Sequence, residues 1–111
     1  MNRKTRVRYM RLVLFFDLPV ETPSEQKTYR QFRKKLIEEG YLMLQKSVYS
    51  KLVINENAAS AAIDRLRKIR PEKGLVQVLK VTEKQYVSMI YVTGDEVEHD
   101  EIDTTDELLI I

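Results

Sequence analysis

The sequence predicts an α+β fold in which strands and helices follow one another in the order βαββαβ, on three observations. Two helical patterns, at residues 22–40 and 55–70, each come directly after a segment of strand character. A further apolar strand pattern follows the second helix at residues 75–81. Hydrophobic residues make up 43% and charged residues 32% of the 111 positions, which is typical of a soluble globular chain with one domain and one core.

The first strand is predicted at Arg11–Leu18, where an almost continuous apolar run favours burial on both faces. Thr22 can cap the helix that follows, Pro23 suits its first position, and Glu25 completes a capping box. Gly40 marks the end of this helix. Its buried face is expected at Tyr29, Phe32, Leu36 and Ile37, which recur at helical spacing.

Residues 41–54 have strand character and contain neither Gly nor Pro. Because this segment exceeds the usual length of a strand, a bend or hairpin near Lys46 and Ser47 is predicted to divide it, although no standard turn dipeptide marks the place. Asn55 or Asn57 can cap the second helix, and Pro71 stops it. Its buried side is expected at Ala59, Ile63, Leu66 and either Ile69 or Arg70.

After the strand at residues 75–81, Thr82 and Gln85 form a second capping box, which predicts a short helical turn through about Ser88. Residues 89–93 are predicted to return to strand before Gly94. The whole is a ferredoxin-like layout with an extra C-terminal strand, in which both long helices cover one face of an antiparallel sheet. The other face needs cover, which a symmetric homodimer supplies most simply. Because this layout serves many functions, the fold alone assigns none.

Composition narrows the class of protein. Cysteine is absent, so a disulfide framework and a thiolate metal site are both excluded. The longest early apolar run, Leu12–Phe16, is too short for a signal-peptide core or a membrane span. The expected compartment is therefore the cytoplasm.

Charge is unevenly distributed along the chain. All 19 Lys and Arg residues lie within residues 1–94, together with nine acids, whereas residues 95–111 hold eight acids and no Lys or Arg. We therefore expect a core with a basic N-terminal arm at residues 1–94 and an acidic tail at residues 95–111. The basic part favours a nucleic-acid partner, and the tail either addresses a basic partner, competes for that surface or only aids solubility. The tail ends in four apolar residues suited to adding a strand to a sheet edge: Leu108, Leu109, Ile110 and Ile111.

Asp17 ends the first strand, where a carboxylate is costly unless a charged or hydrogen-bonding group meets it. One interpretation is a turn acid before Pro19 that binds nearby backbone. The other is a metal or catalytic site. The residues of this stretch leave both open.

Several segments together resemble the CRISPR-associated protein 2 family. They are "LVLFFDLP", "EEGYLMLQKSVYSKL", "VLKVTEKQY" and the acidic tail, and the resemblance extends over residues 9–111 in the same order. The pattern is most similar to the versions found beside a single-protein RNA-guided effector. The resemblance implies a ferredoxin-like homodimer that partners the CRISPR integrase, bridges integrase dimers and supports a captured double-stranded DNA.

Within this resemblance, Asp17 matches an acidic residue that comes as a pair across the dimer axis. Two facing carboxylates repel each other and recruit a cation, and Mg²⁺ suits such a site because it needs few protein ligands. Asp17 would then be both metal ligand and catalytic residue of an endonuclease. Many relatives place Tyr where this chain has Phe16, so turnover is expected to be weak or absent. Ser47 and Tyr49 are either supporting hydroxyl groups near the axis or ordinary strand residues.

Basic residues follow both helices. Lys27, Arg30 and Lys34 lie opposite the buried face of the first helix, and Arg65 and Lys68 lie one turn apart on the second. They form either a solvated face or, doubled by a two-fold axis, a track for the backbone of a duplex. The lone His99 among the tail acids is not expected to bind a metal.

Three functions stay open at this point. The favoured one is a CRISPR adaptation subunit with an acidic Mg²⁺ site between its protomers. The second is an independent Mg²⁺-dependent endonuclease that cuts RNA or DNA. The third is a ferredoxin-like regulatory module that binds a small molecule or a protein, which no Gly-rich phosphate loop supports.

Overall fold

The computed structural model describes residues 9–94 and confirms the predicted order of strands and helices. A short helix, α3, follows the last strand directly. Within this part of the chain, none of the helices has the length and apolar character needed to cross a membrane. The elements are β1 (Met10–Asp17), α1 (Pro23–Glu38), β2 (Leu42–Gln45), β3 (Val48–Val53), α2 (Glu56–Ile69), β4 (Leu75–Thr82) and α3 (Glu83–Val87).

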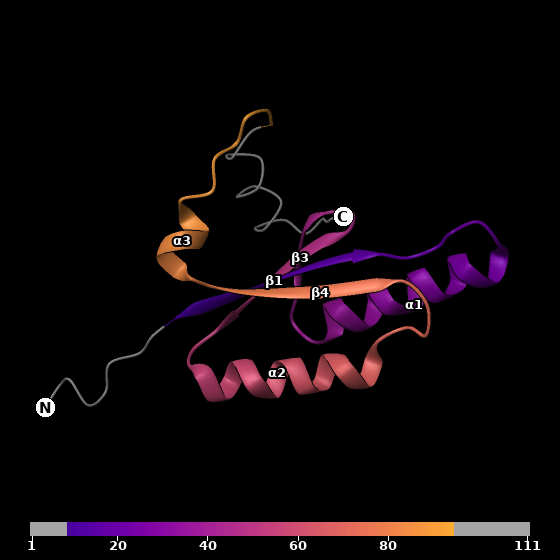
Figure 1. Ribbon diagram of the computed structural model, residues 1–111, viewed down its shortest axis with the longest axis horizontal. Helices are drawn as coiled ribbons and strands as arrows, with labels where there is room; N and C mark the ends of the chain where they lie inside the picture. The colour runs from indigo at the N-terminus through magenta and orange to yellow at the C-terminus, as the bar shows by residue number, and fades with distance from the viewer. Residues whose placement is uncertain (1–8, 95–111) are drawn as a thin grey trace, which may run out of the picture.

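The four strands form one antiparallel sheet in the order β2-β3-β1-β4. The long helices α1 and α2 cover one face of this sheet, and α3 lies on the other side (Figure 1). The central strand is β1, which pairs with β3 on one side and with β4 on the other. Its last residue, Asp17, lies opposite Leu75, the first residue of β4. The ferredoxin-like prediction is therefore confirmed.

The predicted capping residues set the starts of the helices. The Glu25 backbone N–H donates to the Thr22 hydroxyl at 3.1 Å, and the Glu25 carboxylate accepts from the Thr22 backbone N–H at 3.1 Å. A second reciprocal pair forms at Thr82, ahead of α3. Of the two candidates for the cap of α2, the structure uses Asn55 and not Asn57. Both capping boxes predicted from the sequence are confirmed.

The core lies between the sheet and the two long helices. Leu14 and Phe16 of β1 pack there with Phe32 and Leu36 of α1. Ile37 was expected on the same buried face, but it is 54% exposed, so that prediction is wrong. Each residue turns about 100° around an α-helix, which carries the neighbour of Leu36 to the side of the stripe. On α2 the buried residues are Ala59, Ala62 and Leu66, and Ile63 and Ile69 are partly buried.

The hairpin between β2 and β3 turns at Lys46 and Ser47, as predicted. The Tyr29 hydroxyl of α1 donates to the Lys46 carbonyl at 3.0 Å. The Phe16 backbone N–H of β1 donates to the Ser47 carbonyl at 3.1 Å. Contacts with distant elements therefore hold this turn in place, which explains how it forms without a standard turn dipeptide.

The extra strand predicted at residues 89–93 is not formed, and this prediction is wrong. The chain leaves α3 at Ser88 and continues without strand pairing to Gly94, with Ile90 83% and Val92 90% exposed. Apolar and β-branched residues favour a strand only where a neighbouring strand supplies hydrogen bonds and packing. The basic arm before residue 9, His99 and the apolar end Leu108–Ile111 lie outside the described residues.

Candidate functional site

The sheet face that α1 and α2 leave open is apolar. Side chains along a strand alternate between faces, and because Phe16 is buried under the helices, Phe15 lies on the open face. Phe15 is 38% exposed, and Leu79 of β4, which pairs with Val13, is 53% exposed. Exposed apolar side chains that lie beside one another are typical of interaction surfaces. By strand register, three more exposed leucines lie on the same face: Leu42, Leu52 and Leu75.

Asp17 lies at the margin of this open face. It follows the buried Phe16, so its carboxylate is on the same side of the sheet as Phe15, and it is exposed. Within residues 9–94, no hydrogen bond or ion pair holds the carboxylate. The interpretation of Asp17 as a turn acid that binds nearby backbone is therefore not supported. Its carboxylate is free to bind a ligand from outside the chain.

Gly74 fixes the main chain at this strand end. Its φ is +95°, and a Cβ added to it would lie 2.8 Å from the Asp17 carbonyl oxygen and 2.6 Å from Leu18 Cδ2. Only a residue without a side chain allows the turn before β4 to approach β1 this closely. The position of Asp17 therefore depends on Gly74 as well as on strand pairing.

The described residues do not form a complete metal site around Asp17. Among residues 9–94, no three His, Cys, Asp or Glu side chains form a group that could hold a metal ion. Mg²⁺ needs only one or two protein carboxylates because it keeps several waters. The free carboxylate of Asp17 fits such an ion if a second carboxylate comes from another chain.

Tyr49 is not brought together with Asp17. It pairs with Leu14 and is 0% exposed in the core under the helices, on the opposite side of the sheet. Burial raises the pKa of its hydroxyl. The hydroxyl accepts a hydrogen bond from Arg33 Nε at 2.8 Å. Of the two interpretations of Tyr49, a supporting hydroxyl near the dimer axis or an ordinary strand residue, its burial favours the second, because the side-chain alternation of β3 turns this ring toward α1.

Ser47 and Phe16 differ in how they relate to Asp17. Ser47 is half-buried in the β2–β3 turn, and its carbonyl binds the Phe16 N–H, which places it near the same end of β1. The Phe16 ring points the other way and meets the Phe32 ring edge-on at 5.3 Å between centroids. Position 16 therefore serves the core in this chain and does not share a face with Asp17.

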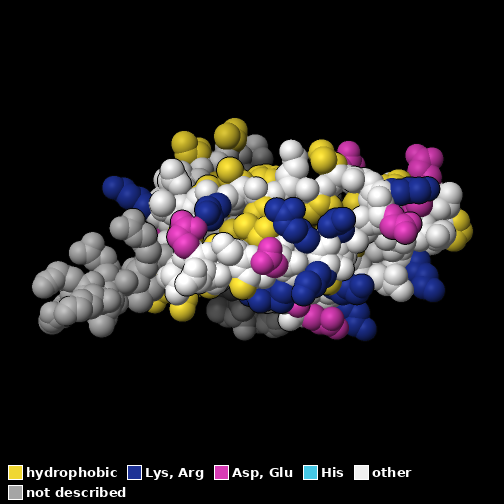
Figure 2. Space-filling view, turned by 60° about the horizontal axis from the view of Figure 1, so that its bottom comes forward, with side chains coloured by type: hydrophobic (Ala, Val, Ile, Leu, Met, Phe, Trp, Pro, Cys, Tyr) yellow, Lys and Arg dark blue, Asp and Glu magenta, His cyan; other side chains and the backbone are white. Residues whose placement is uncertain are grey.

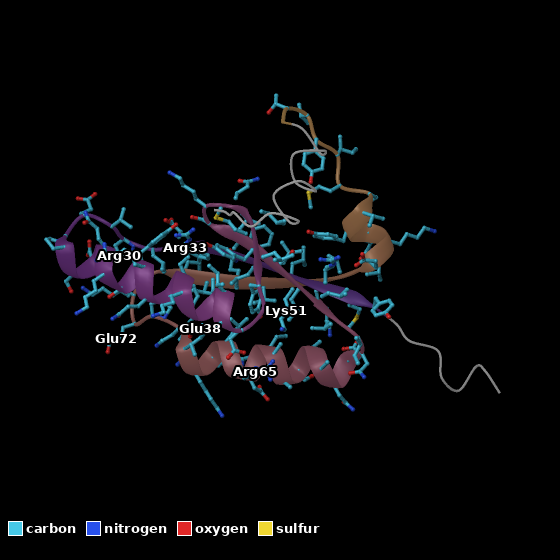
Figure 3. All side chains as sticks on the ribbon, turned by 180° about the vertical axis from the view of Figure 1, so that it is seen from behind. Arg30, Arg33, Glu38, Lys51, Arg65 and Glu72 are labelled. Atoms are coloured by element: carbon cyan, nitrogen blue, oxygen red, sulfur yellow. The ribbon has the colours of Figure 1, made fainter. Side chains whose placement is uncertain are left out.

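Basic side chains gather on the helix-covered side of the molecule (Figure 2). Lys27, Arg30 and Lys34 are exposed along α1, and Lys68 is exposed on α2. Arg65 differs, because its Nε donates to Glu39 Oε1 at 2.6 Å and its charge is already paired. Arg30 projects from the side of α1 that faces away from α2, whereas Arg65 comes from α2 itself (Figure 3). The predicted basic residues therefore share one side of the molecule but not one row.

A polar cluster closes the end of α1, and sequence reasoning missed it. Lys51 Nζ donates to the Glu39 carbonyl at 2.6 Å. A cation at this place is favourable because the C-terminal end of a helix carries partial negative charge. Burial raises the pKa of Tyr41 to about 12, so its hydroxyl stays neutral. Within the described residues, this hydroxyl is the buried side-chain polar atom without a hydrogen-bond partner. The Lys51 hydrogen bond joins the end of α1 to β3.

The helix α3 is held over one end of the open sheet face. Arg11 Nε donates to Glu83 Oε1 at 2.8 Å, and the Arg11 guanidinium lies 4.4 Å from the centroid of the Tyr86 ring. The Tyr86 hydroxyl is 3.1 Å from the Ser50 hydroxyl. A cleft of about 370 Å³ with a mostly apolar lining lies between α3 and the strands. Among residues 9–94, no element covers the end of the face that carries Asp17 and Leu75, both of which are exposed.

Comparison with known proteins gives consistent matches. Residues 10–89 match the protein family described as CRISPR associated protein Cas2. The chain is 51% identical over 86 residues to the CRISPR-associated endoribonuclease Cas2 of Streptococcus mutans serotype c (strain ATCC 700610 / UA159), which covers 78% of this chain and 79% of that protein. It is 47% identical over 102 residues to the protein of the same name from Treponema denticola, covering 92% and 99%. The crystal structure of Streptococcus pyogenes Cas2 at pH 6.5 shares the fold with a TM-score of 0.57 at 20% identity, covering 76% of this chain and 99% of that one.

Proposed function

Because the chain belongs to the CRISPR-associated Cas2 family, we propose that it is a CRISPR adaptation subunit of a system with a single-protein effector. In this proposal a homodimer bridges dimers of the CRISPR integrase and supports a captured DNA duplex. The observation that carries the proposal is the open apolar sheet face with the free Asp17 carboxylate at its margin.

The homodimer follows from the apolar character of the open face. Phe15, Leu75 and Leu79 expose apolar surface beside one another in β1 and β4. Burial of such surface contributes about 25 cal/mol for each Å² removed from water, which favours association. A second copy of the chain offers the same surface, and a two-fold axis lets each copy cover the other.

The Mg²⁺ site follows from the same symmetry. Two copies of Asp17, one from each protomer, would hold the ion between them, since the described residues of one chain contain no group of three ligands that could hold it. When bound, the ion would supply charge stabilisation for phosphodiester hydrolysis. Asp17 itself would bind the ion and orient it. A carboxylate without internal hydrogen bonds keeps its oxygens available for this role.

The duplex would contact the basic, helix-covered side of the dimer. Lys27, Arg30 and Lys34 on α1 and Lys68 on α2 carry exposed charges that could pair with phosphates, and Arg65 would contribute less because Glu39 already binds it. Phosphate contacts position a duplex without reading its sequence. Such binding suits a subunit that must accept many different captured fragments.

The tail, residues 95–111, would bind the partner protein. Its eight acids would attract a basic surface of the integrase. Its apolar end, Leu108–Ile111, would add a strand to a sheet edge of the integrase or of the other protomer. Removal of residues 95–111 should abolish integrase binding and leave the folded core intact. Titration calorimetry with the integrase measures this, and unchanged affinity would contradict the role of the tail.

Reconstitution tests the proposal as a whole. The purified chain is mixed with the integrase of the same locus and a labelled duplex, and integration into a repeat-containing plasmid is measured. We expect integration to require this chain and to survive Asp17→Asn, because bridging depends on shape and charge. Integration that proceeds equally well without the chain would contradict the proposal.

An independent endonuclease is the second candidate, and the names of the relatives favour it. The proteins from Streptococcus mutans and Treponema denticola are both called endoribonucleases. If this candidate is right, the chain alone should cut RNA or DNA in the presence of Mg²⁺, and EDTA should stop the cleavage. Both candidate functions use the same dimer and the same Asp17 pair. The cleavage assay therefore shows whether the chain cuts nucleic acid, but both functions place the metal at the same residues.

A further inference from the structure

Arg33 of α1 is fixed in place by a buried hydroxyl group. Its Nε donates to the Tyr49 hydroxyl at 2.8 Å, and Tyr49 is 0% exposed. Burial raises the pKa of Tyr49, so the hydroxyl stays neutral and available as an acceptor. The Arg33 side chain is thereby held at its Nε by a core residue before any ligand arrives. This interaction joins α1 to β3.

The remaining N–H groups of Arg33 are unused and reach the surface. A guanidinium carries five N–H donors, of which Nε supplies one and the two terminal nitrogens supply four. Within residues 9–94, no acidic side chain forms an ion pair with Arg33. The buried polar atom without a partner in this part of the chain belongs to Tyr41, so the terminal nitrogens of Arg33 are accessible. Arg33 therefore presents a fixed cation without a counter-charge.

The surroundings of Arg33 add a second cation and a rigid frame. Arg30 lies one turn earlier on α1, is exposed, and has no ion pair within the described residues. Figure 3 shows Arg30 and Arg33 on the same side of the helix, away from α2. The Tyr29 hydroxyl ties this part of α1 to the Lys46 carbonyl at 3.0 Å. Two tyrosines thus hold this stretch of helix against the β2–β3 hairpin.

We propose that Arg33, held by Tyr49 and assisted by Arg30, is a phosphate-binding site for the backbone of a nucleic-acid duplex. A planar guanidinium with its Nε already bonded offers its terminal N–H pair to two oxygens of one phosphate, which a lysine cannot do. Because the fork is fixed beforehand, little side-chain freedom is lost on binding. Tyr49 acts as a positioning residue for Arg33.

This inference rests on the proposed function, because it assigns residues to the binding of the same duplex. It adds a site that the spacing of basic residues did not reveal. Lys27, Arg30 and Lys34 stand out at helical spacing, whereas Arg33 lies toward the sheet and is half-buried. Among the basic residues of α1, Arg33 is the one bound to a side chain of the core.

The test measures the affinity of the full chain for a fluorescein-labelled DNA duplex by anisotropy over a range of salt concentrations. Arg33→Lys keeps the charge and removes the fork, and it should weaken binding about fivefold. The matched control is Lys35→Arg, which makes the opposite exchange at an exposed position of α1 outside the proposed duplex contacts and should stay within about twofold of wild type. Arg33→Gln should also lower the salt slope of log K by about 0.9 for each copy in contact with phosphate.

A double-mutant cycle tests the role of Tyr49. Tyr49→Phe keeps the ring and removes the hydroxyl, so it should weaken binding about two- to threefold without changing the salt slope. In the Arg33→Gln background, Tyr49→Phe should weaken duplex binding no further. If Tyr49 served only the stability of the fold, its loss would weaken binding equally in both backgrounds. Thermal unfolding of each variant shows that the comparison is made on folded protein.

The outcomes separate the site from the proposed function. Equal affinities for wild type and Arg33→Lys, or additive effects of Tyr49→Phe and Arg33→Gln, would overturn the assignment while leaving duplex binding in place. Absence of salt-dependent duplex binding by the wild-type chain would contradict the proposed function, and the assignment would fall with it.

Discussion

Replacement of Gly74 by alanine should destabilise the protein much more than replacement of Gly94. Both glycines have nearly the same backbone conformation, with φ of +95° and +97°. A non-glycine residue pays roughly 1–2 kcal/mol for a left-handed conformation at either place. The two positions differ in what the new Cβ would meet, so the pair separates the cost of the backbone angle from the cost of the contact.

The additional cost at Gly74 follows from distances. The Cβ would lie 2.8 Å from the Asp17 carbonyl oxygen and 2.6 Å from Leu18 Cδ2, whereas at Gly94 it would meet nothing within 4 Å. Main-chain atoms cannot rotate away, so the turn before β4 must separate from the end of β1. Overpacking of this kind typically costs about 1–3 kcal/mol beyond the backbone term. The melting temperature of a domain of this size falls by about 4–8 °C for each kcal/mol.

The assay is thermal unfolding of both variants and wild type, followed by circular dichroism at one protein concentration, because dimer stability depends on concentration. Gly74→Ala should melt well below Gly94→Ala. Amide chemical shifts of Asp17 and Leu18 should move in Gly74→Ala alone. Equal melting temperatures for the two variants would refute the close approach of the β4 turn to Asp17.

Three other predictions concern the metal, the dimer and a buried phenol. Asp17→Asn should abolish any Mg²⁺-dependent cleavage and leave the dimer intact. Duplex binding should stay equal or become tighter, because the substitution removes negative charge. If the variant still cuts at the wild-type rate in a cleavage assay, another site or a contaminant is responsible. Leu79→Glu places a charge on the open sheet face and should give a monomer in sedimentation analysis, unless a different surface forms the dimer. Tyr41 has its pKa raised to about 12, so the unfolded chain releases this proton first and stability should fall as pH rises from about 10 to 12. Tyr41→Phe should reduce that loss and raise the free energy of unfolding by up to about 1 kcal/mol, since the hydroxyl it removes is buried without a partner in the described residues.

Much of the fold could be predicted from the sequence, because the relevant signals are local. Thr22 with Glu25 and Thr82 with Gln85 form the capping boxes that their spacing predicts. The local sequence pattern gave wrong predictions where contacts with another element decide whether a residue is buried or a strand forms. Ile37 looks like part of the buried stripe but lies outside it, and residues 89–93 have strand composition but no strand partner in the described chain.

The candidate site could be predicted only in part. Asp17 was identified from its place at a strand end and from a family resemblance, and the structure adds that its carboxylate is free and faces the open side of the sheet. The face on which Tyr49 lies depends on the register of the β2–β3 hairpin, which no turn dipeptide marks. Arg33 was missed because its partner, Tyr49, is sixteen positions away and lies in another element.

The central claim is that the open sheet face, with Asp17 at its margin, lies against the same face of a second copy. Because the chain has no cysteine, a single introduced cysteine reports on its own surroundings. Asp17→Cys and, as the control on the helix-covered side, Lys68→Cys are each oxidised under the same conditions, and covalent dimers are measured on a denaturing gel. We expect a cross-linked dimer for Asp17→Cys and none for Lys68→Cys. Cross-linking of Lys68→Cys with none for Asp17→Cys would contradict the claim.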